Sequence, residues 1–96
     1  MAQVNLGVCV LRATGDLPAL DGFSLSGGLS DWYVRFGPYS NGEWLDEASC
    51  GVRDDTSHPI WDGCCYDFAT ARHATLRFEL LDFDFIGSDA LCCAAE

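Results

Sequence analysis

The sequence predicts an all-β protein, an antiparallel β-sandwich formed by a single domain over residues 1–96. Apolar residues recur at period two in short runs, and turn formers separate the runs about every dozen residues. No segment combines a helical repeat with a capping residue. A hydrophobic fraction of 49% with 12% aromatic residues supplies a folded core rather than a disordered chain.

The first three strands are predicted from composition and alternation. "VNLGVCVLRA" (4–13) places Leu6, Val8 and Val10 on one face. "DWYVRFG" (31–37) and "CCYDFA" (64–69) are short and rich in aromatic and β-branched residues. Turns are predicted at the glycine- and aspartate-rich stretches "GFSLSGGLSD", "GPYSNGEW", "RDDTSHP" and "IGSD".

The strand "ATLRFELLDFD" (74–84) changes character along one face. Leu76, Phe78 and Leu80 are predicted to face the core, and the same parity continues into Asp82 and Asp84. Two carboxylates on one face repel each other unless a cation lies between them. The alternative is that the strand simply ends here and water solvates both acids.

A second acidic segment favours the cation. "LPALDGFSLSGGLSDWYV" (17–34) carries Asp21 and Asp31 at the two ends of a loop rich in glycine and serine. If both loops lie at one end of the sandwich, five carboxylates gather there: Asp21, Asp31, Asp82, Asp84 and Asp89. Calcium takes six to eight oxygen ligands from flexible loops, so calcium is the predicted cation.

The charge balance excludes several partners. Fifteen acidic residues face five arginines and no lysine, which gives a formal net charge of −10. Nucleic acid is therefore excluded as a partner, because phosphate binding needs clustered cations. A polybasic lipid-binding patch is equally hard to build from five scattered arginines.

Six cysteines are expected to be reduced: Cys9, Cys50, Cys64, Cys65, Cys92 and Cys93. The chain has enough apolar residues to form a core without disulfide cross-links, and four of the six cysteines come as adjacent pairs. Neighbours on a strand point to opposite faces, so each pair would need two different partners. No recognisable secretory signal opens the sequence, which also favours thiols. Zinc is not expected, because no matching cysteine and histidine spacing occurs.

An ordered set of short motifs resembles the C2 domain family. In order they read "L-x-V-x-V-x-x-A" (6–13), "L-x-x-L-D" (17–21), "G-x-S-D-x-Y-V" (28–34), "P-x-W-D" (59–62) and "L-x-F-x-L-x-D-x-D" (76–84). The resemblance implies an antiparallel sandwich whose loops at one end bind calcium and then phospholipid. It places metal ligands at the five aspartates named above, with backbone carbonyls of Leu20 and Phe83 beside them.

The sequence departs from the family pattern at four places. Trp32 stands where a proline commonly follows the second ligand, and His58 stands where an asparagine usually precedes Pro59. The first acidic loop is longer than usual and carries Phe23 and Leu25. After Asp89 only "ALCCAAE" (90–96) remains, so the sandwich should be one strand short of the usual eight. That edge could instead be completed by another chain, as a homodimer or by a partner protein.

The predicted function is calcium-dependent docking on anionic phospholipid, without catalysis. Phe23, Leu25, Phe85 and Ile86 are apolar residues in loops that should be polar, and they are the expected membrane contacts. One of Phe85 and Ile86 could fold back onto the core instead. The alternative function is calcium-independent protein binding on the same fold. The expected location is cytoplasmic with peripheral membrane association, or secreted if the chain is part of a larger perforin-like protein.

Overall fold

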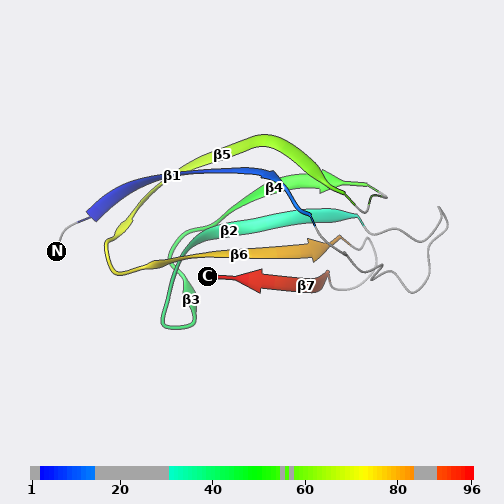
Figure 1. The fold of residues 1–96 in the computed structure, drawn as a ribbon. Helices are drawn as coiled ribbons and strands as arrows, with labels where there is room; N and C mark the ends of the chain where they lie inside the picture. Colours follow the sequence, from blue (N-terminus) through cyan, green and yellow to red (C-terminus); the bar gives the residue numbers. More distant parts are fainter. Residues whose placement is uncertain (1–2, 15–30, 55, 57, 84–88) are drawn as a thin grey trace.

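The computed structural model describes residues 3–14, 31–54, 56, 58–83 and 89–96. Seven strands lie in these segments (Figure 1): β1 (Gln3–Arg12), β2 (Trp32–Ser40), β3 (Glu43–Trp44), β4 (Ala48–Arg53), β5 (Ile60–Ala71), β6 (Thr75–Asp82) and β7 (Ala90–Ala95). Every strand pair is antiparallel. The predicted all-β sandwich is therefore confirmed. The described residues contain no helix that could span a membrane.

The strands form two facing sheets of unequal size (Figure 1). One sheet contains β1 and β5, and the other has the order β3-β2-β6-β7, with β4 also paired to β2. β2 and β6 are paired along eight residues, from Trp32 opposite Asp82 to Tyr39 opposite Thr75. This central pair contributes Trp32, Val34, Phe36 and Leu80 to the buried core. Because the first sheet is narrow, it covers only part of the second.

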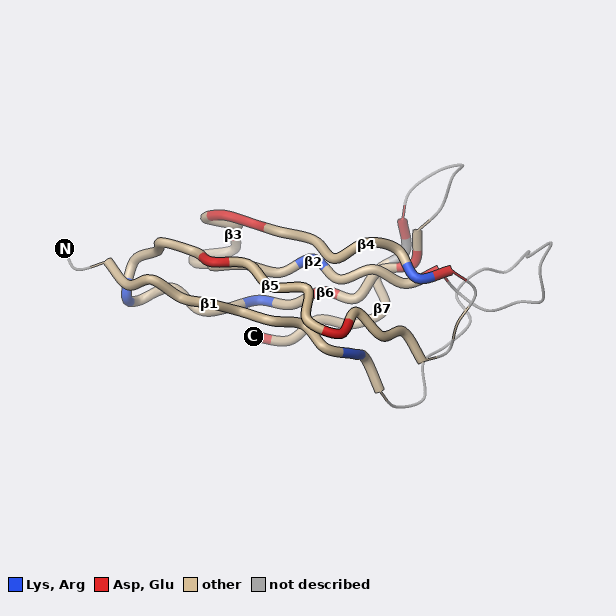
Figure 2. Tube along the Cα trace, turned by 90° about the horizontal axis from the view of Figure 1, so that it is seen from above, with Lys and Arg blue, Asp and Glu red and all other residues tan. Residues whose placement is uncertain are grey.

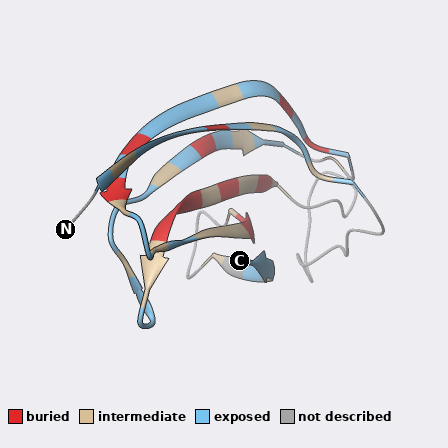
Figure 3. Ribbon diagram, turned by 60° about the vertical axis from the view of Figure 1, so that its left-hand side comes forward, coloured by how far each residue is buried: buried red, intermediate tan, exposed pale blue. Residues whose placement is uncertain are grey.

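The core lies between β2 and β5. Trp32, Phe36 and Phe68 are almost completely buried, and the rings of Phe36 and Phe68 meet edge to face with centroids 5.8 Å apart. Leu80 is buried in the same cluster, and Phe78 packs against it, as the alternation predicts. Figure 3 shows buried positions along β2, whereas the described side chains of β7 are mainly exposed. Burial of these large apolar side chains is the main favourable term for folding.

Two features of the β2–β4 region differ from the sequence prediction. β2 does not turn at Gly37 but continues to Ser40, and the turn consists of Asn41 and Gly42, both at positive φ (52° and 79°). Asn–Gly is the preferred pair for such a hairpin turn. Gly37 lies against the Asp46 backbone, where a Cβ would clash with the carbonyl oxygen. The strand β4 was not predicted, because four of its six residues are small (Ala48, Ser49, Cys50 and Gly51) and only Val52 is of the aromatic or β-branched kind typical of strands.

The expectation of six reduced cysteines is wrong. Cys9 is bonded to Cys65 and Cys50 to Cys64. Cys64 and Cys65 do need two different partners, and the fold provides both. Cys65 lies directly opposite Cys9 in the β1–β5 ladder, while Cys64 bonds across to the buried Cys50 of β4. Only Cys92 and Cys93 keep free thiols.

Candidate functional site

Three of the predicted ligands lie where strands meet the acidic loops at one end of the sandwich. Asp31 immediately precedes β2, Asp82 is the last residue of β6, and Asp89 immediately precedes β7. Figure 2 shows acidic positions beside the points where the undescribed loops leave this end. The antiparallel pairing of β2 with β6, and of β6 with β7, brings these strand ends together.

Asp82 is held by the backbone of Asp31. The Asp31 backbone N–H donates to Asp82 Oδ1 at 2.9 Å, and the Phe83 N–H donates to the Asp31 carbonyl oxygen at 2.8 Å. Asp82 is only 1% exposed, and its Oδ2 has no hydrogen-bond partner within the described residues. A buried carboxylate oxygen without a partner is unfavourable, so it favours a cation or proton nearby.

Asp89 is positioned by a tyrosine that the sequence analysis did not assign to the site. The Tyr33 hydroxyl donates a 2.5 Å hydrogen bond to Asp89 Oδ2. Burial, followed by this hydrogen bond, raises the pKa of Tyr33 to about 12. The phenol is therefore a neutral donor throughout the physiological range. The two residues are 56 positions apart, and only the motif "D-x-Y-V" hinted that Tyr33 belongs near the acids.

The rest of the predicted set lies outside the described residues. This applies to the ligands Asp21 and Asp84, to the carbonyl of Leu20, and to the expected membrane contacts Phe23, Leu25, Phe85 and Ile86. Phe83 is described and half-buried at the end of β6, next to Asp82. Among the residues whose placement is described, no three acidic, cysteine or histidine side chains form a metal-binding group.

The three described aspartates, Asp31, Asp82 and Asp89, are nevertheless chemically suitable ligands for a calcium ion. Carboxylate oxygens and backbone carbonyls are the ligands that calcium prefers. Such an ion would satisfy Asp82 Oδ2, which has no hydrogen-bond partner in the part of the chain that the structure describes. Asp31 and Asp89 supply further carboxylates from neighbouring strand ends. A complete coordination sphere would need the loop residues as well.

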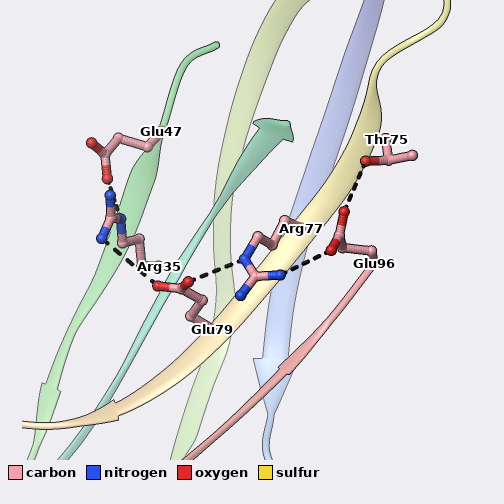
Figure 4. A network of polar contacts seen from close by, with 6 residues as sticks. All are labelled: Arg35, Glu47, Thr75, Arg77, Glu79 and Glu96. Carbon is pink, nitrogen blue, oxygen red and sulfur yellow. Dashed lines mark hydrogen bonds and ion pairs between the residues drawn. The ribbon is translucent and has the colours of Figure 1, made fainter. Parts of the chain in front are cut away.

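The outer face of the large sheet carries an ion-pair network that the sequence analysis did not detect. Arg35 pairs with Glu47 and Glu79, and Arg77 pairs with Glu79 at 3.1 Å and with Glu96 at 2.9 Å (Figure 4). Arg35 also stacks over Trp44, and Arg77 over Tyr39. Two of the five arginines are thereby engaged by glutamates, so this face is unsuited to binding phosphate.

Comparison with solved structures decides the fold family. The C2A domain of plant extended synaptotagmin 1 superimposes with a TM-score of 0.74 at 19% identity, over 95% of this chain and 65% of that chain. The fold is that of a C2 domain. Human GIVD cytosolic phospholipase A2 in complex with methyl gamma-linolenyl fluorophosphonate gives a TM-score of 0.75 at 25% identity, over 95% of this chain. A second structure of that enzyme, with the inhibitor and terbium chloride, gives a TM-score of 0.75 at 26% identity.

The C2 fold is typically a binding module, and the matches extend only to the fold. This chain spans 65% of the synaptotagmin domain chain and 12% and 13% of the two phospholipase chains. No family model matches the sequence, and no curated protein matches it either. The residues described above, rather than a close relative, must therefore carry the functional argument.

Proposed function

We propose that this chain is a calcium-binding module that docks reversibly on anionic phospholipid membranes through the acidic and apolar loops at one end of the sandwich. The observation that carries the proposal is the Asp82 carboxylate, which is buried and has one oxygen without a partner among the described residues. The C2 fold supports the proposal, because its strand pairing brings Asp31, Asp82 and Asp89 to the same end of the large sheet.

The ligand set would draw on three strand ends and two loops. Asp31, Asp82 and Asp89 would supply carboxylates from the described residues, while Asp21 and Asp84 would extend the set. The carbonyl groups of Leu20 and Phe83 are the proposed backbone ligands. A bound calcium ion would offset the carboxylate charge and offer coordination positions to lipid oxygens.

The apolar loop residues would provide the second part of the membrane contact. Phe23, Leu25, Phe85 and Ile86 are the proposed residues, each adding apolar area to a docked state. The outer sheet face would not contribute, because Arg35 and Arg77 are already paired with glutamates. We infer no catalytic role for this single domain.

The disulfides favour the secreted alternative over the cytoplasmic expectation. Disulfides persist in oxidising compartments and are rare in the cytosol, and this chain carries two. Calcium-binding modules outside the cell bind the ion with dissociation constants of about 10⁻⁴ to 10⁻³ M. We therefore expect an affinity in that range. Cell fractionation, with the thiols blocked before lysis, tests the compartment and the disulfides together.

Liposome sedimentation with calcium and with chelator is the decisive experiment. The wild type should sediment with phosphatidylserine vesicles in calcium only. Asp82→Asn combined with Asp84→Asn should abolish this binding, whereas Asp67→Asn, which removes one charge from an exposed position on β5, should not. Equal sedimentation in calcium and in chelator would refute the proposal. If the protein sediments in neither condition and calcium does not change its melting temperature, the protein-binding alternative is favoured.

Terbium luminescence separates metal binding from lipid binding. Trp32 is fully buried and lies opposite Asp82 in the β2–β6 ladder, so it can sensitise a lanthanide held by Asp82. Emission that rises with terbium and falls on adding calcium is expected for the wild type. Emission without vesicle binding would indicate a structural ion only.

The C-terminal edge remains the proposed site for a homodimer or a partner protein. β7 lies at the end of the sheet and pairs only with β6 within the described strands. An edge strand of this kind can pair with another chain. Light scattering over a wide concentration range tests the dimer, and a constant monomer mass would reject it.

A further inference from the structure

The two cysteines outside the disulfides have their sulfur atoms in contact. The Cys93 thiol donates to Cys92 Sγ at 2.8 Å. Neighbouring residues of a regular strand point to opposite faces, so such contact requires an irregularity. Cys93 pairs with Leu80 and Leu91 pairs with Leu81, which leaves Cys92 without an opposite residue on β6. This one-residue bulge brings the two thiols together.

A cavity adjoins Cys93, the exposed member of this thiol pair. Cys93 is exposed and lines a cavity of about 380 Å³ between β1 and the β6–β7 pair, where the narrow sheet leaves the wide one uncovered. The walls are mainly apolar, and Arg12 at the end of β1 lines the same cavity. Arg12 makes no ion pair within the described residues. The carboxylate of Glu79, whose residue also lines the cavity, is engaged by Arg35 and Arg77.

The cysteine inventory indicates what this pair can do. The other four cysteines form two disulfides, so the fold is compatible with oxidising conditions. A bond between Cys92 and Cys93 would join residues whose Cα atoms are about 3.8 Å apart across a trans peptide. Disulfides usually span about 4.4–6.8 Å between Cα atoms, and strained ones are the easily reduced ones. Oxidation at this pair should therefore be readily reversible.

We propose that Cys92 and Cys93 form a thiol–disulfide exchange site that accepts a small anionic disulfide. The Cys93 thiolate attacks one sulfur of the bound disulfide, the disulfide bond breaks, and the leaving thiolate takes up a proton. Cys92 then loses its proton and attacks Cys93 Sγ, which releases the second thiol. In total the dithiol loses two electrons and two protons, and the small disulfide becomes two thiols.

The roles of the two thiols and of Arg12 follow from their surroundings. Cys92 is half-buried against the core. Burial is the main cause that raises the pKa of Cys92 to about 11, so Cys92 is the poorer first nucleophile. The exposed Cys93 attacks first and Cys92 resolves the mixed disulfide. The Arg12 guanidinium would pair with a carboxylate of the substrate, which defines the anionic class.

The test treats the full chain with oxidised glutathione, blocks the remaining thiols and measures intact mass. In excess oxidised glutathione the wild type should form the internal disulfide, and reduced glutathione added afterwards should return the pair to the dithiol. Cys92→Ser should accumulate glutathione on Cys93, and Cys93→Ser should react roughly tenfold more slowly at the half-buried Cys92. The double variant, which keeps both structural disulfides, should not react. A persistent glutathione adduct on the wild type, a disulfide-linked dimer, or unreacted thiols would each overturn the proposal.

A charge comparison tests the substrate class. Arg12→Gln should slow oxidation by oxidised glutathione severalfold, while oxidation by cystamine, a cationic disulfide, should not slow. The rate for Arg12→Gln is divided by the wild-type rate for each reagent, which cancels the general attraction of a chain of charge −10 for cations. Equal slowing with both reagents would overturn the assignment to anionic disulfides.

Discussion

Asp82 is buried as deeply as the aromatic residues around it, yet only one of its carboxylate oxygens has a partner among the described residues. Replacing it by asparagine keeps an acceptor for the Asp31 N–H and removes the buried charge. We expect Asp82→Asn to raise the free energy of unfolding by about 1 kcal/mol in chelator and to abolish stabilisation by calcium. Urea denaturation with and without calcium measures both effects.

Asp67→Asn is the matched control for this prediction. It removes one carboxylate from an exposed position on β5, so neither stability nor the calcium response should change by more than about 0.5 kcal/mol. Strong destabilisation by Asp82→Asn in chelator would mean that the carboxylate has a structural role instead.

Tyr33 makes stability depend on pH in the alkaline range. Its pKa is about 12 in the folded chain against an ordinary value of 10.0, because of burial and the hydrogen bond to Asp89. The folded state therefore retains a proton that the unfolded state loses. The contribution of Tyr33 is complete below pH 10 and is lost as pH rises towards 12. Tyr33→Phe should remove this component of the pH dependence.

Ultraviolet absorbance measures the Tyr33 ionisation directly. The wild type should show a phenolate signal that develops near pH 12, and Tyr33→Phe should lack it. Tyr66→Phe changes an exposed phenol on β5 and should leave that signal in place. An identical alkaline titration for wild type and Tyr33→Phe would contradict the hydrogen bond to Asp89.

At the scale of elements, the two disulfides tie the small sheet together and link it to the large one. Cys9 and Cys65 are separated by 56 residues, and Cys50 and Cys64 by 14. By the loop-entropy relation, removing the first bridge should lower the free energy of unfolding by about 4 kcal/mol and the second by about 3 kcal/mol. Paired cysteine-to-alanine variants, compared by urea denaturation under non-reducing conditions, test this order. Cys92→Ala with Cys93→Ala should change stability much less. Equal losses of stability in all three double variants would contradict the assignment of the two disulfides.

How far the sequence predicted these elements depended on the range of the interactions involved. Strands with clear alternation, such as the one that buries Leu80, follow from local pattern and were predicted correctly. The disulfides were missed, because spacing along the chain does not tell which strands become neighbours. The bulge at Cys92 was missed for the same reason, since it arises from register with β6. The acidic segments predicted that Asp31 and Asp82 lie at the same end, but their hydrogen bond and the Tyr33–Asp89 bond became visible only with the assembled strand ends.

At the scale of the whole molecule, charge is distributed unevenly between the sheet and the loop end. On the outer face of the large sheet, glutamates neutralise Arg35 and Arg77 in the network of Figure 4. The candidate carboxylates lie at strand ends instead, in a chain of net charge −10. Without calcium, the loop end should be repelled by an anionic membrane more strongly than the outer face, where the two arginines offset most of the charge of three glutamates. Calcium would thus act as a switch by changing the charge where docking takes place.

The apolar loop residues should strengthen docking without setting its calcium dependence. A fully buried side chain of this type contributes about 1.5–3 kcal/mol, and shallow insertion recovers only part of it. Phe85→Ser with Ile86→Ser should therefore weaken capture on phosphatidylserine vesicles, while calcium affinity in solution stays unchanged. Leu45→Ser is the matched control, because Leu45 is 50% exposed and follows β3, away from the acidic strand ends (Figure 1).

Salt dependence distinguishes this switch from simple electrostatic attraction. Screening weakens interactions between exposed charges, but direct coordination and apolar contact persist. Raising the salt concentration from 0.1 to 0.5 M should therefore reduce vesicle capture of the wild type only in part. The Phe85→Ser, Ile86→Ser variant lacks the apolar contact, so the same salt increase should remove a larger fraction of its binding. Complete release of the wild type by salt would indicate that calcium merely screens repulsion, and it would remove the role proposed for the apolar loop residues.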